Sequence, residues 1–375
     1  MSESLSVAEL EALVRRVFAP RSEDRQIAIL VDLPDAALED TAGWLDRREM
    51  ALEWVSKLRQ SNLGMDRVDL IAYPNVRTNN ADLPSGAMRC AVSDDEQAEN
   101  VPIESVLRDY SIILAMTQLS ASAPLKIAAP RLQFRAASMP GFSRAMLPAL
   151  RLDFDEVQRR CHEVKERLDL ADSAQIFWRA GGADGQLHLD LRGRVAVASG
   201  GVIREAGIAG NLPSGETFIV PYEGERDGDP SRTAGKLPLE IDGELMFLTI
   251  EANRVVDVEG SGTAVERQRR AFQDEPAFTN VAELGLGILG DYGVQAVGET
   301  LLDEKLGLHI AFGRSDHFPG GTVGTQHFSA PDRVAHIDYV YVRESQPQVQ
   351  IVELSLQSAN RDDATLMLNG AWTIQ

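Results

Sequence analysis

The 375-residue chain has few cysteines, too few basic residues to balance its acidic ones, and no long apolar run. Its two cysteines, Cys90 and Cys161, are too few and too far apart for a disulfide framework, which excludes the small disulfide-stapled secreted proteins. Lys and Arg number 37 against 57 Asp and Glu, so the formal net charge is −20. A surface of this sign repels phosphate backbones and anionic lipids. We therefore expect neither nucleic acid nor a membrane as a partner.

A targeting or membrane-spanning segment is also lacking. Residues 1–16 carry acidic side chains where a signal peptide has basic ones, and they contain no apolar core segment. No stretch approaches the roughly 20 apolar residues that a membrane helix needs. These features, together with the low cysteine content, predict a cytoplasmic protein. The composition, with 44% apolar and 25% charged residues, is that of a globular protein, and the length predicts two domains.

Helix-like and strand-like segments alternate in the first half of the chain. Ser6 and Glu9 have the spacing of a capping box at the start of an amphipathic helix, 5–18. Short apolar runs typical of buried strands occur at 27–31, 68–73 and 112–116. The apolar period of an amphipathic helix occurs at 44–60 and 153–169. This alternation predicts an α/β N-terminal domain with a mostly parallel sheet, residues 1–170.

The hydrophobic period changes to two after about residue 172. Leu187, Leu189 and Leu191 alternate with polar residues, and short strand-like segments continue to the C-terminus, interrupted by one helical segment at 263–272. This pattern predicts an α+β, strand-rich C-terminal domain, residues 171–375. We expect it to carry the functional site, because the residues that suggest chemistry lie within it.

Four of the six histidines fall within one short stretch: His309, His317, His327 and His336. The run that begins at His336 alternates like a strand, so His336 and Asp338 project from the same face and make a pair of metal-ligating side chains. His309 lies within another short strand-like segment, 308–312. A lone histidine on an apolar strand is more often a core residue, but two such strands in one domain favour a metal site.

Two glutamates have suggestive surroundings as well. Glu216 ends a tight turn and Glu283 lies among apolar and small residues, where a carboxylate is costly to bury unless it is paired or bound to metal. Glu283 precedes the glycine string Gly285, Gly287 and Gly290, which formally matches a dinucleotide fingerprint. Residues 273–282 are a poor buried strand, so we disfavour a nicotinamide site and expect flexible glycines around a ligand carboxylate.

The segments 211–216, 283–287, 303–313 and 336–338, in this order along the chain, resemble the thermophilic metallo-aminopeptidase family of the aminopeptidase T and AmpS type. The resemblance covers residues 205–342 well and the N-terminal half in general layout. It implies a homodimer with a dinuclear site of two divalent metal ions per chain, zinc, manganese or cobalt. The family's ligands are two glutamates, two histidines, an aspartate and a tyrosine, which correspond here to Glu216, Glu283, His309, His336, Asp338 and, at the tyrosine's position, Asp316. Asp316 is followed by His317, and either can take the tyrosine's place.

The chain also resembles, more distantly, the 2,5-dihydroxypyridine dioxygenases, a family with the same fold that uses one Fe(II). His336 and Asp338 match two of their three iron ligands, whereas Glu283 stands at the position of the remaining histidine. A triad of His309, His336 and Asp338 is chemically possible but does not follow the dioxygenase pattern.

The sequence therefore predicts a metallo-aminopeptidase-like hydrolase that cleaves an N-terminal peptide or small amide bond through a metal-bridged water. Glu216 or Glu283 is expected to carry the proton to the leaving amine. The acidic charge favours a small substrate with a free α-amino group. The alternatives are a mononuclear non-haem Fe(II) dioxygenase acting on a small aromatic or N-heterocycle, and a non-catalytic relative.

Overall fold

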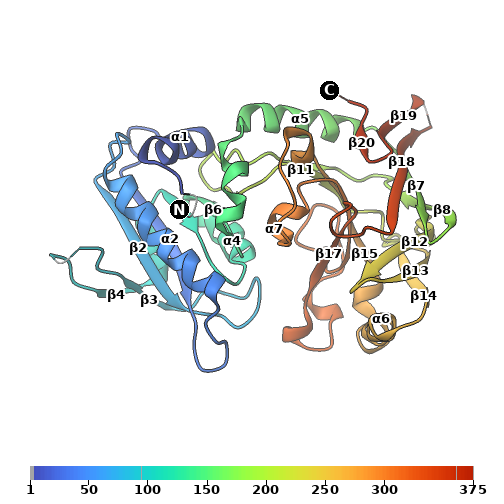
Figure 1. The fold of residues 1–375 in the computed structure, drawn as a ribbon, viewed down its shortest axis with the longest axis horizontal. Helices are drawn as coiled ribbons and strands as arrows, with labels where there is room; N and C mark the ends of the chain where they lie inside the picture. Colours follow the sequence, from blue (N-terminus) through green and yellow to red (C-terminus); the bar gives the residue numbers. More distant parts are fainter. Residues whose placement is uncertain (1–3, 94, 360, 375) are drawn as a thin grey trace. The chain divides into compact units, whose positions relative to one another are not determined.

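The computed structural model describes residues 4–93, 95–359 and 361–374, and its ribbon is drawn in Figure 1. The chain divides into two compact units. The first unit contains the residues up to Gln158 together with Ser199–Ser214, and the second contains Arg159–Ala198 and the residues from Gly215 onward. The coarse prediction of an α/β part and a strand-rich part is confirmed by the sheets described below.

The first unit is built on a seven-stranded sheet with the order β10-β6-β5-β1-β2-β3-β4. Its five consecutive strands from β10 to β2 are parallel, and β3 and β4 add an antiparallel edge. Both faces of β1 are buried, as expected for a parallel sheet covered by helices. The strands are β1 (Gln26–Leu33), β2 (Arg67–Pro74), β3 (Gly86–Arg89), β4 (Glu99–Pro102), β5 (Ile112–Ala115), β6 (Arg135–Ser138) and β10 (Ala209–Asn211).

Helices α1, α2 and α5 follow the predicted segments 5–18, 44–60 and 153–169 closely, whereas α3 and α4 were not predicted. Helix α2 packs against β1 and β2 (Figure 1). Helix α5 carries a fully buried stripe on the predicted apolar face, consisting of Phe154, Val157, Cys161, Val164 and Leu168. None of the helices in the described part of the chain is long and apolar enough to cross a membrane. The helices of the first unit are α1 (Val7–Phe18), α2 (Ala42–Arg59), α3 (Ile103–Asp109) and α4 (Ser122–Leu132). Helix α5 (Phe154–Leu168) contains the boundary between the units, since the second unit begins at Arg159.

The observed division differs from a single boundary at residue 170. Strand β10 returns from the later part of the chain to complete the first sheet, where it pairs in parallel with β6. The Ala136 amide donates to the Ile208 carbonyl at 3.0 Å, and the Leu212 amide donates to the Ser138 carbonyl at 3.0 Å. This pairing satisfies backbone groups that β6 would otherwise expose at an edge.

The second unit contains two sheets. The five-stranded sheet has the order β17-β16-β15-β11-β9, and the eight-stranded sheet has the order β14-β13-β12-β8-β7-β18-β19-β20. Helix α6 packs against β13 and β14 of the larger sheet (Figure 1). The elements are β7 (Ser173–Ala180), β8 (Ala183–Asp190), β9 (Val197–Ser199), β11 (Glu216–Ile219), β12 (Ala234–Ile241), β13 (Glu244–Glu251), β14 (Arg254–Glu259), α6 (Thr263–Asp274), β15 (Val281–Gly287), α7 (Thr300–Asp303), β16 (Leu308–Gly313), β17 (His336–Val340), β18 (Val349–Ser358), β19 (Arg361–Leu368) and β20 (Ala371–Trp372).

Candidate metal centre

Four neighbouring strands of the five-stranded sheet bring five of the predicted ligands together. Glu216 begins β11, Glu283 lies within β15, His309 lies within β16, and His336 and Asp338 lie on β17. All neighbouring pairs among these strands are antiparallel, and their register aligns the functional residues across the sheet. Residues far apart in the chain thus become neighbours.

The five side chains form two overlapping groups that share Glu283. The first group is Glu216, Glu283 and His309, and the second is Glu283, His336 and Asp338; within each group the ligand atoms lie within 4.8 Å of one another. Glu283 Oε1 is 3.2 Å from His309 Nε2, and Glu283 Oε2 is 3.0 Å from His336 Nε2. One carboxylate therefore places an oxygen in each group, as a bridging ligand between two ions does.

The ionisable side chains of this cluster are largely buried from solvent. None of the five side chains is more than 16% exposed. Burial alone would lower the pKa of His309, but its contact with Glu283 and the charges of Glu216 and Asp338 outweigh burial and raise the pKa to about 9. The pKa of His336 is raised for the same kind of reason, by Asp338 and Glu283. Three close carboxylates thus favour positive charge between them, which protons or divalent ions can supply.

The imidazole of His336 is oriented by a backbone carbonyl. Its Nδ1 lies 2.7 Å from the Arg314 carbonyl oxygen, which can only accept, so Nδ1 carries the proton. Nε2 faces Glu283 and Asp338, and it becomes free to ligate when a divalent ion displaces the second proton of the ring. This arrangement, with one ring nitrogen donating to the protein and the other free to ligate, is common to metal-binding histidines. The donor set of two imidazoles and three carboxylates fits divalent ions such as zinc, manganese, cobalt or iron.

The glycine string belongs to this site and not to a dinucleotide fold. A side chain at Gly285 would place its Cβ 1.8 Å from His309 Nε2, and one at Gly287 would meet the Lys305 backbone at 2.1 Å. A Cβ at Gly290 would come within 2.7 Å of the Leu306 carbonyl oxygen. Two of the glycines lie inside β15 and the third in a short 3-10 turn, so no helix opens at the string. The glycines allow the His309 ring and the 305–306 backbone to approach β15 and the turn after it closely. This role differs from the flexibility predicted from the sequence.

Asp316 does not join either group of ligands. Its Oδ1 lies 2.6 Å from Arg314 Nε in an ion pair, and its side chain is 32% exposed. His317, the other residue considered for the tyrosine's place, is exposed, and its ring lies 5.2 Å from that of His336 at an interplanar angle of 87°. The structure therefore brings together five of the six predicted ligands and places the sixth in a separate ion pair.

Two further charged residues reach the cluster although sequence reasoning assigned them no role. Lys305 is fully buried, and its Nζ lies 2.6 Å from Glu216 Oε1 while also contacting Glu304. Burial would lower the pKa of Lys305, but the two carboxylates outweigh burial and raise it, so the side chain is an ammonium. Burial raises the pKa of Glu304 to about 8, although Lys305 opposes this. Both residues lie in the segment 303–313, which is one of those that carry the family resemblance, but no role was assigned to them from the sequence.

A loop next to the cluster carries aromatic side chains. The Phe318 ring lies 4.5 Å from that of Phe218 and 5.4 Å from that of His336. Glu223 ties this loop down, because its carboxylate accepts hydrogen bonds from Ser315 Oγ at 2.7 Å and from the Thr322 amide and hydroxyl at 2.6 Å each. The loop that places Phe318 beside His336 is thus held by Glu223, a carboxylate that is not itself part of the candidate metal-binding groups.

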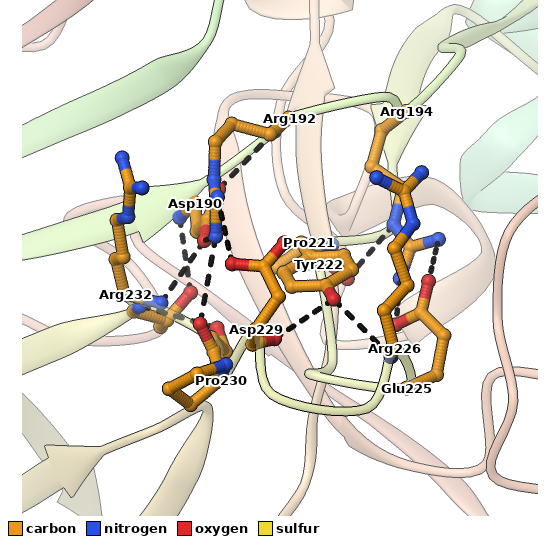
Figure 2. A network of polar contacts seen from close by, with 12 residues as sticks. Asp190, Arg192, Arg194, Pro221, Tyr222, Glu225, Arg226, Asp229, Pro230 and Arg232 are labelled. Carbon is orange, nitrogen blue, oxygen red and sulfur yellow. Dashed lines mark hydrogen bonds and ion pairs between the residues drawn. The ribbon is translucent and has the colours of Figure 1, made fainter.

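The segment that carries Glu223 is in turn secured by a polar network around Tyr222 (Figure 2). The guanidinium groups of Arg192, Arg194 and Arg226 lie 5.1, 5.3 and 5.6 Å from the centre of the Tyr222 ring. The Tyr222 hydroxyl donates to the Asp229 carbonyl at 2.8 Å, and Arg194 forms a two-bond fork with Glu225 (Figure 2). These contacts fix the backbone that follows β11.

Comparisons with known proteins identify the fold. No family model matches the chain, and no curated protein matches it by sequence. Among solved structures, a 2,5-dihydroxypyridine dioxygenase from Pseudomonas putida KT2440 matches with a TM-score of 0.61 and 15% identity, over 98% of this chain and 97% of that one. AmpT from Thermus thermophilus matches with a TM-score of 0.55 and 14% identity, over 98% and 99%. The chain thus shares the fold of these two proteins over nearly its whole length.

Proposed function

We propose that the protein is a metal-dependent hydrolase that holds two divalent ions in the groups joined by Glu283 and cleaves an N-terminal peptide or small amide bond. The observation that carries this proposal is the position of Glu283, with one oxygen 3.2 Å from His309 Nε2 and the other 3.0 Å from His336 Nε2. The structural similarity to AmpT supports it at the level of the fold.

Each residue of the proposed centre has a distinct role in the reaction. Glu283 joins the two groups, with His309 and Glu216 on one side and His336 and Asp338 on the other. When bound, the ions supply a hydroxide nucleophile near neutral pH and a Lewis acid for the carbonyl oxygen. Because Glu283 directs one oxygen into each group, Glu216 is the carboxylate that would accept the proton of the attacking water, on Oε1 beside Lys305, and deliver it to the leaving amine. The acidic surroundings favour a substrate with a free α-amino group.

The test begins with metal analysis of protein purified without chelators or added metal. We expect close to two zinc, manganese or cobalt ions per chain, and release of the N-terminal residue from small peptides. His336→Ala removes a ligand and should abolish metal binding at its group and lower peptidase activity by at least about a hundredfold. A His336→Ala variant with normal metal content and activity would contradict the proposal.

A matched control is available in the same unit. His188 is a half-buried strand histidine on β8 whose Nδ1 lies 2.9 Å from Gln175 Nε2, and it belongs to neither ligand group. His188→Ala should leave metal content and activity unchanged. If both histidine variants lose metal equally, the loss reflects a general effect on folding and not ligation.

The second candidate function is a mononuclear non-haem iron dioxygenase acting on a small aromatic or N-heterocyclic ring. The group of Glu283, His336 and Asp338 is complete as a three-ligand site by itself, and the dioxygenase of Pseudomonas putida has the same fold. One iron per chain, with oxygen uptake on dihydroxylated pyridines, would select this function. Metal binding without turnover of either substrate class would indicate a non-catalytic relative.

We also propose a cytoplasmic homodimer, in line with the family resemblance of the sequence. Light scattering after size exclusion measures this directly, with an expected mass of twice the 41.0 kDa chain. A mass of one chain at micromolar concentration would contradict the dimer and leave the metal chemistry unaffected, because all five proposed ligands lie within one chain.

A further inference from the structure

A lysine without a role in the proposed reaction lies beside the candidate metal centre. Lys305 has no exposed surface, and its Nζ contacts two carboxylates, Glu216 and Glu304. An ammonium group only donates, so Lys305 cannot ligate a metal ion itself. A buried ammonium group that contacts two carboxylates can orient the one that belongs to the site, which here is Glu216.

We propose that Lys305 is a positioning residue for the metal centre: it engages Oε1 of Glu216 and thereby presents Oε2 as the single ligating oxygen. Oε1 lies 2.6 Å from Lys305 Nζ, whereas Oε2 faces His309, 3.7 Å from its Nε2. This inference rests on the proposed metal-dependent function and adds a residue outside the ligand set. Partners of this kind orient ligands and contribute about ten- to a hundredfold to metal affinity.

The backbone around Lys305 is built to hold its side chain in this place. The Leu289 amide donates to the Lys305 carbonyl at 2.7 Å, and the Gly287 amide donates to the Gly307 carbonyl at 2.8 Å. Gly287 is also the residue that pairs with Glu216 in the β11–β15 ladder. The missing side chain at Gly287 lets the Lys305 backbone pack directly against β15, opposite the carboxylate that the ammonium must reach.

The preceding turn is anchored independently of the cluster. The buried carboxylate of Asp303 accepts hydrogen bonds from the Val297 amide at 2.8 Å and the Gly298 amide at 2.9 Å. The chain is therefore fixed by Asp303 before Lys305 and by the Leu289 contact at Lys305. The ammonium of Lys305 links this turn to Glu216, so its removal tests the positioning role and leaves the backbone contacts in place.

The experiment measures the affinity of Zn²⁺ for the full-length protein by competition with a chromophoric chelator. Lys305→Met keeps most of the side-chain volume and removes the ammonium, so we expect a ten- to a hundredfold weaker affinity. Glu216→Gln should weaken binding as well. The double variant should bind no more weakly than Glu216→Gln alone, because Lys305 acts through Glu216. Additive losses, or wild-type affinity in Lys305→Met, would overturn the inference.

A control and a second readout separate positioning from a general loss of structure. Lys236→Met removes an ammonium that is paired with Glu259 on an exposed part of β12 and belongs to neither ligand group, so this variant should bind Zn²⁺ like the wild type. The Co²⁺-loaded absorption spectrum should change in Lys305→Met, because the coordination by Glu216 changes, and should be unchanged in Lys236→Met. An unchanged Lys305→Met spectrum would count against the inference.

A crystal structure of the Zn²⁺-loaded wild type decides the matter even if Lys305→Met fails to fold. We expect Glu216 to bind the ion through Oε2 alone, with Oε1 still on Lys305. Coordination through both oxygens, or a Lys305 side chain turned away, would overturn the inference and leave the hydrolase proposal intact. A wild-type protein that binds no divalent ion would instead overturn both.

Discussion

Gly285 shows how one missing side chain allows the candidate centre to form. Gly285 pairs with His309 across β15 and β16, and the imidazole occupies the space that a Cβ at Gly285 would fill. Gly285→Ala should therefore displace His309, lower the free energy of unfolding by about 1–3 kcal/mol and abolish metal binding at the Glu216, Glu283 and His309 group. Zn²⁺ titration and urea unfolding measure the two effects.

The matched glycine substitution is Gly43→Ala in helix α2, where an added Cβ meets no atom within 4 Å. Alanine is the better helix former, so this variant should be unchanged or more stable by up to about 1 kcal/mol, with unaltered metal binding. Wild-type Zn²⁺ affinity in Gly285→Ala would show that His309 does not ligate from its position in the structure.

Individual residues differed in how far their roles could be predicted. His336 and Asp338 carry a local signature, since strand alternation alone places both on one face. Cys161 was expected in an apolar helix face, and its burial indeed raises the pKa of the thiol to about 12. Lys305 could not be found in this way, because lysine is usually exposed and Glu216, which it contacts, lies 89 residues away in the sequence. Asp316 was assigned by alignment to a tyrosine, but it pairs with Arg314.

At the scale of elements, helix α1 begins with the capping box expected from the sequence. Ser6 Oγ accepts from the Glu9 amide at 3.2 Å, and the Glu9 carboxylate accepts from the Ser6 amide at 2.8 Å. Ser6→Ala should cost about 1 kcal/mol of unfolding free energy at pH 7. The half-buried Ser56 of α2 provides the control, and Ser56→Ala should be near neutral because alanine favours the helix.

The same contact has a defined pH dependence. Hydrogen bonds from the Ser6 amide and hydroxyl, together with Arg151, lower the pKa of Glu9 from 4.5 to about 2. Because the folded pKa is the lower one, this stabilisation is complete above pH 4.5 and is lost as the pH falls toward 2. The stability difference between wild type and Ser6→Ala should therefore be smaller at pH 3 than at pH 7. A difference that grows on acidification would contradict the assignment.

Strands were predicted best where their apolar pattern is regular. The buried run of β1 was recognised by composition, whereas β15 was not, because glycines interrupt it and residues just before it are polar. Glycine inside a strand usually marks close approach of another group. In β15 that group is an imidazole and a backbone turn, which only the neighbouring strands supply.

At the scale of the whole molecule, the proposed ligands all belong to the second unit. Zn²⁺ at a hundred times its dissociation constant stabilises a folded site by about 2.7 kcal/mol. Hydrogen exchange should therefore slow in peptides from β15, β16 and β17 when Zn²⁺ is added, and the same peptides should not respond in His336→Ala. Peptides from β1 and β2 serve as the internal reference and should change less.

Equal slowing in all these peptides would indicate that metal stabilises the chain as one cooperative structure, and no slowing in β15 to β17 would contradict a metal site in that sheet. The experiment needs no substrate, so its result does not depend on whether the chemistry is hydrolysis or oxygenation. It therefore tests the location of the site separately from the reaction.

The sequence by itself determined that the chain has an α/β part and a strand-rich part and indicated the residues of the candidate metal centre, because hydrophobic period and strand alternation are local properties. Only the tertiary structure decided that 199–214 returns to the first sheet, that Glu283 faces both histidines, and that Lys305 contacts Glu216. Each of these depends on which strands become neighbours and in which register. Pairing is set by packing between segments that lie tens of residues apart, so no single stretch of the chain contains it.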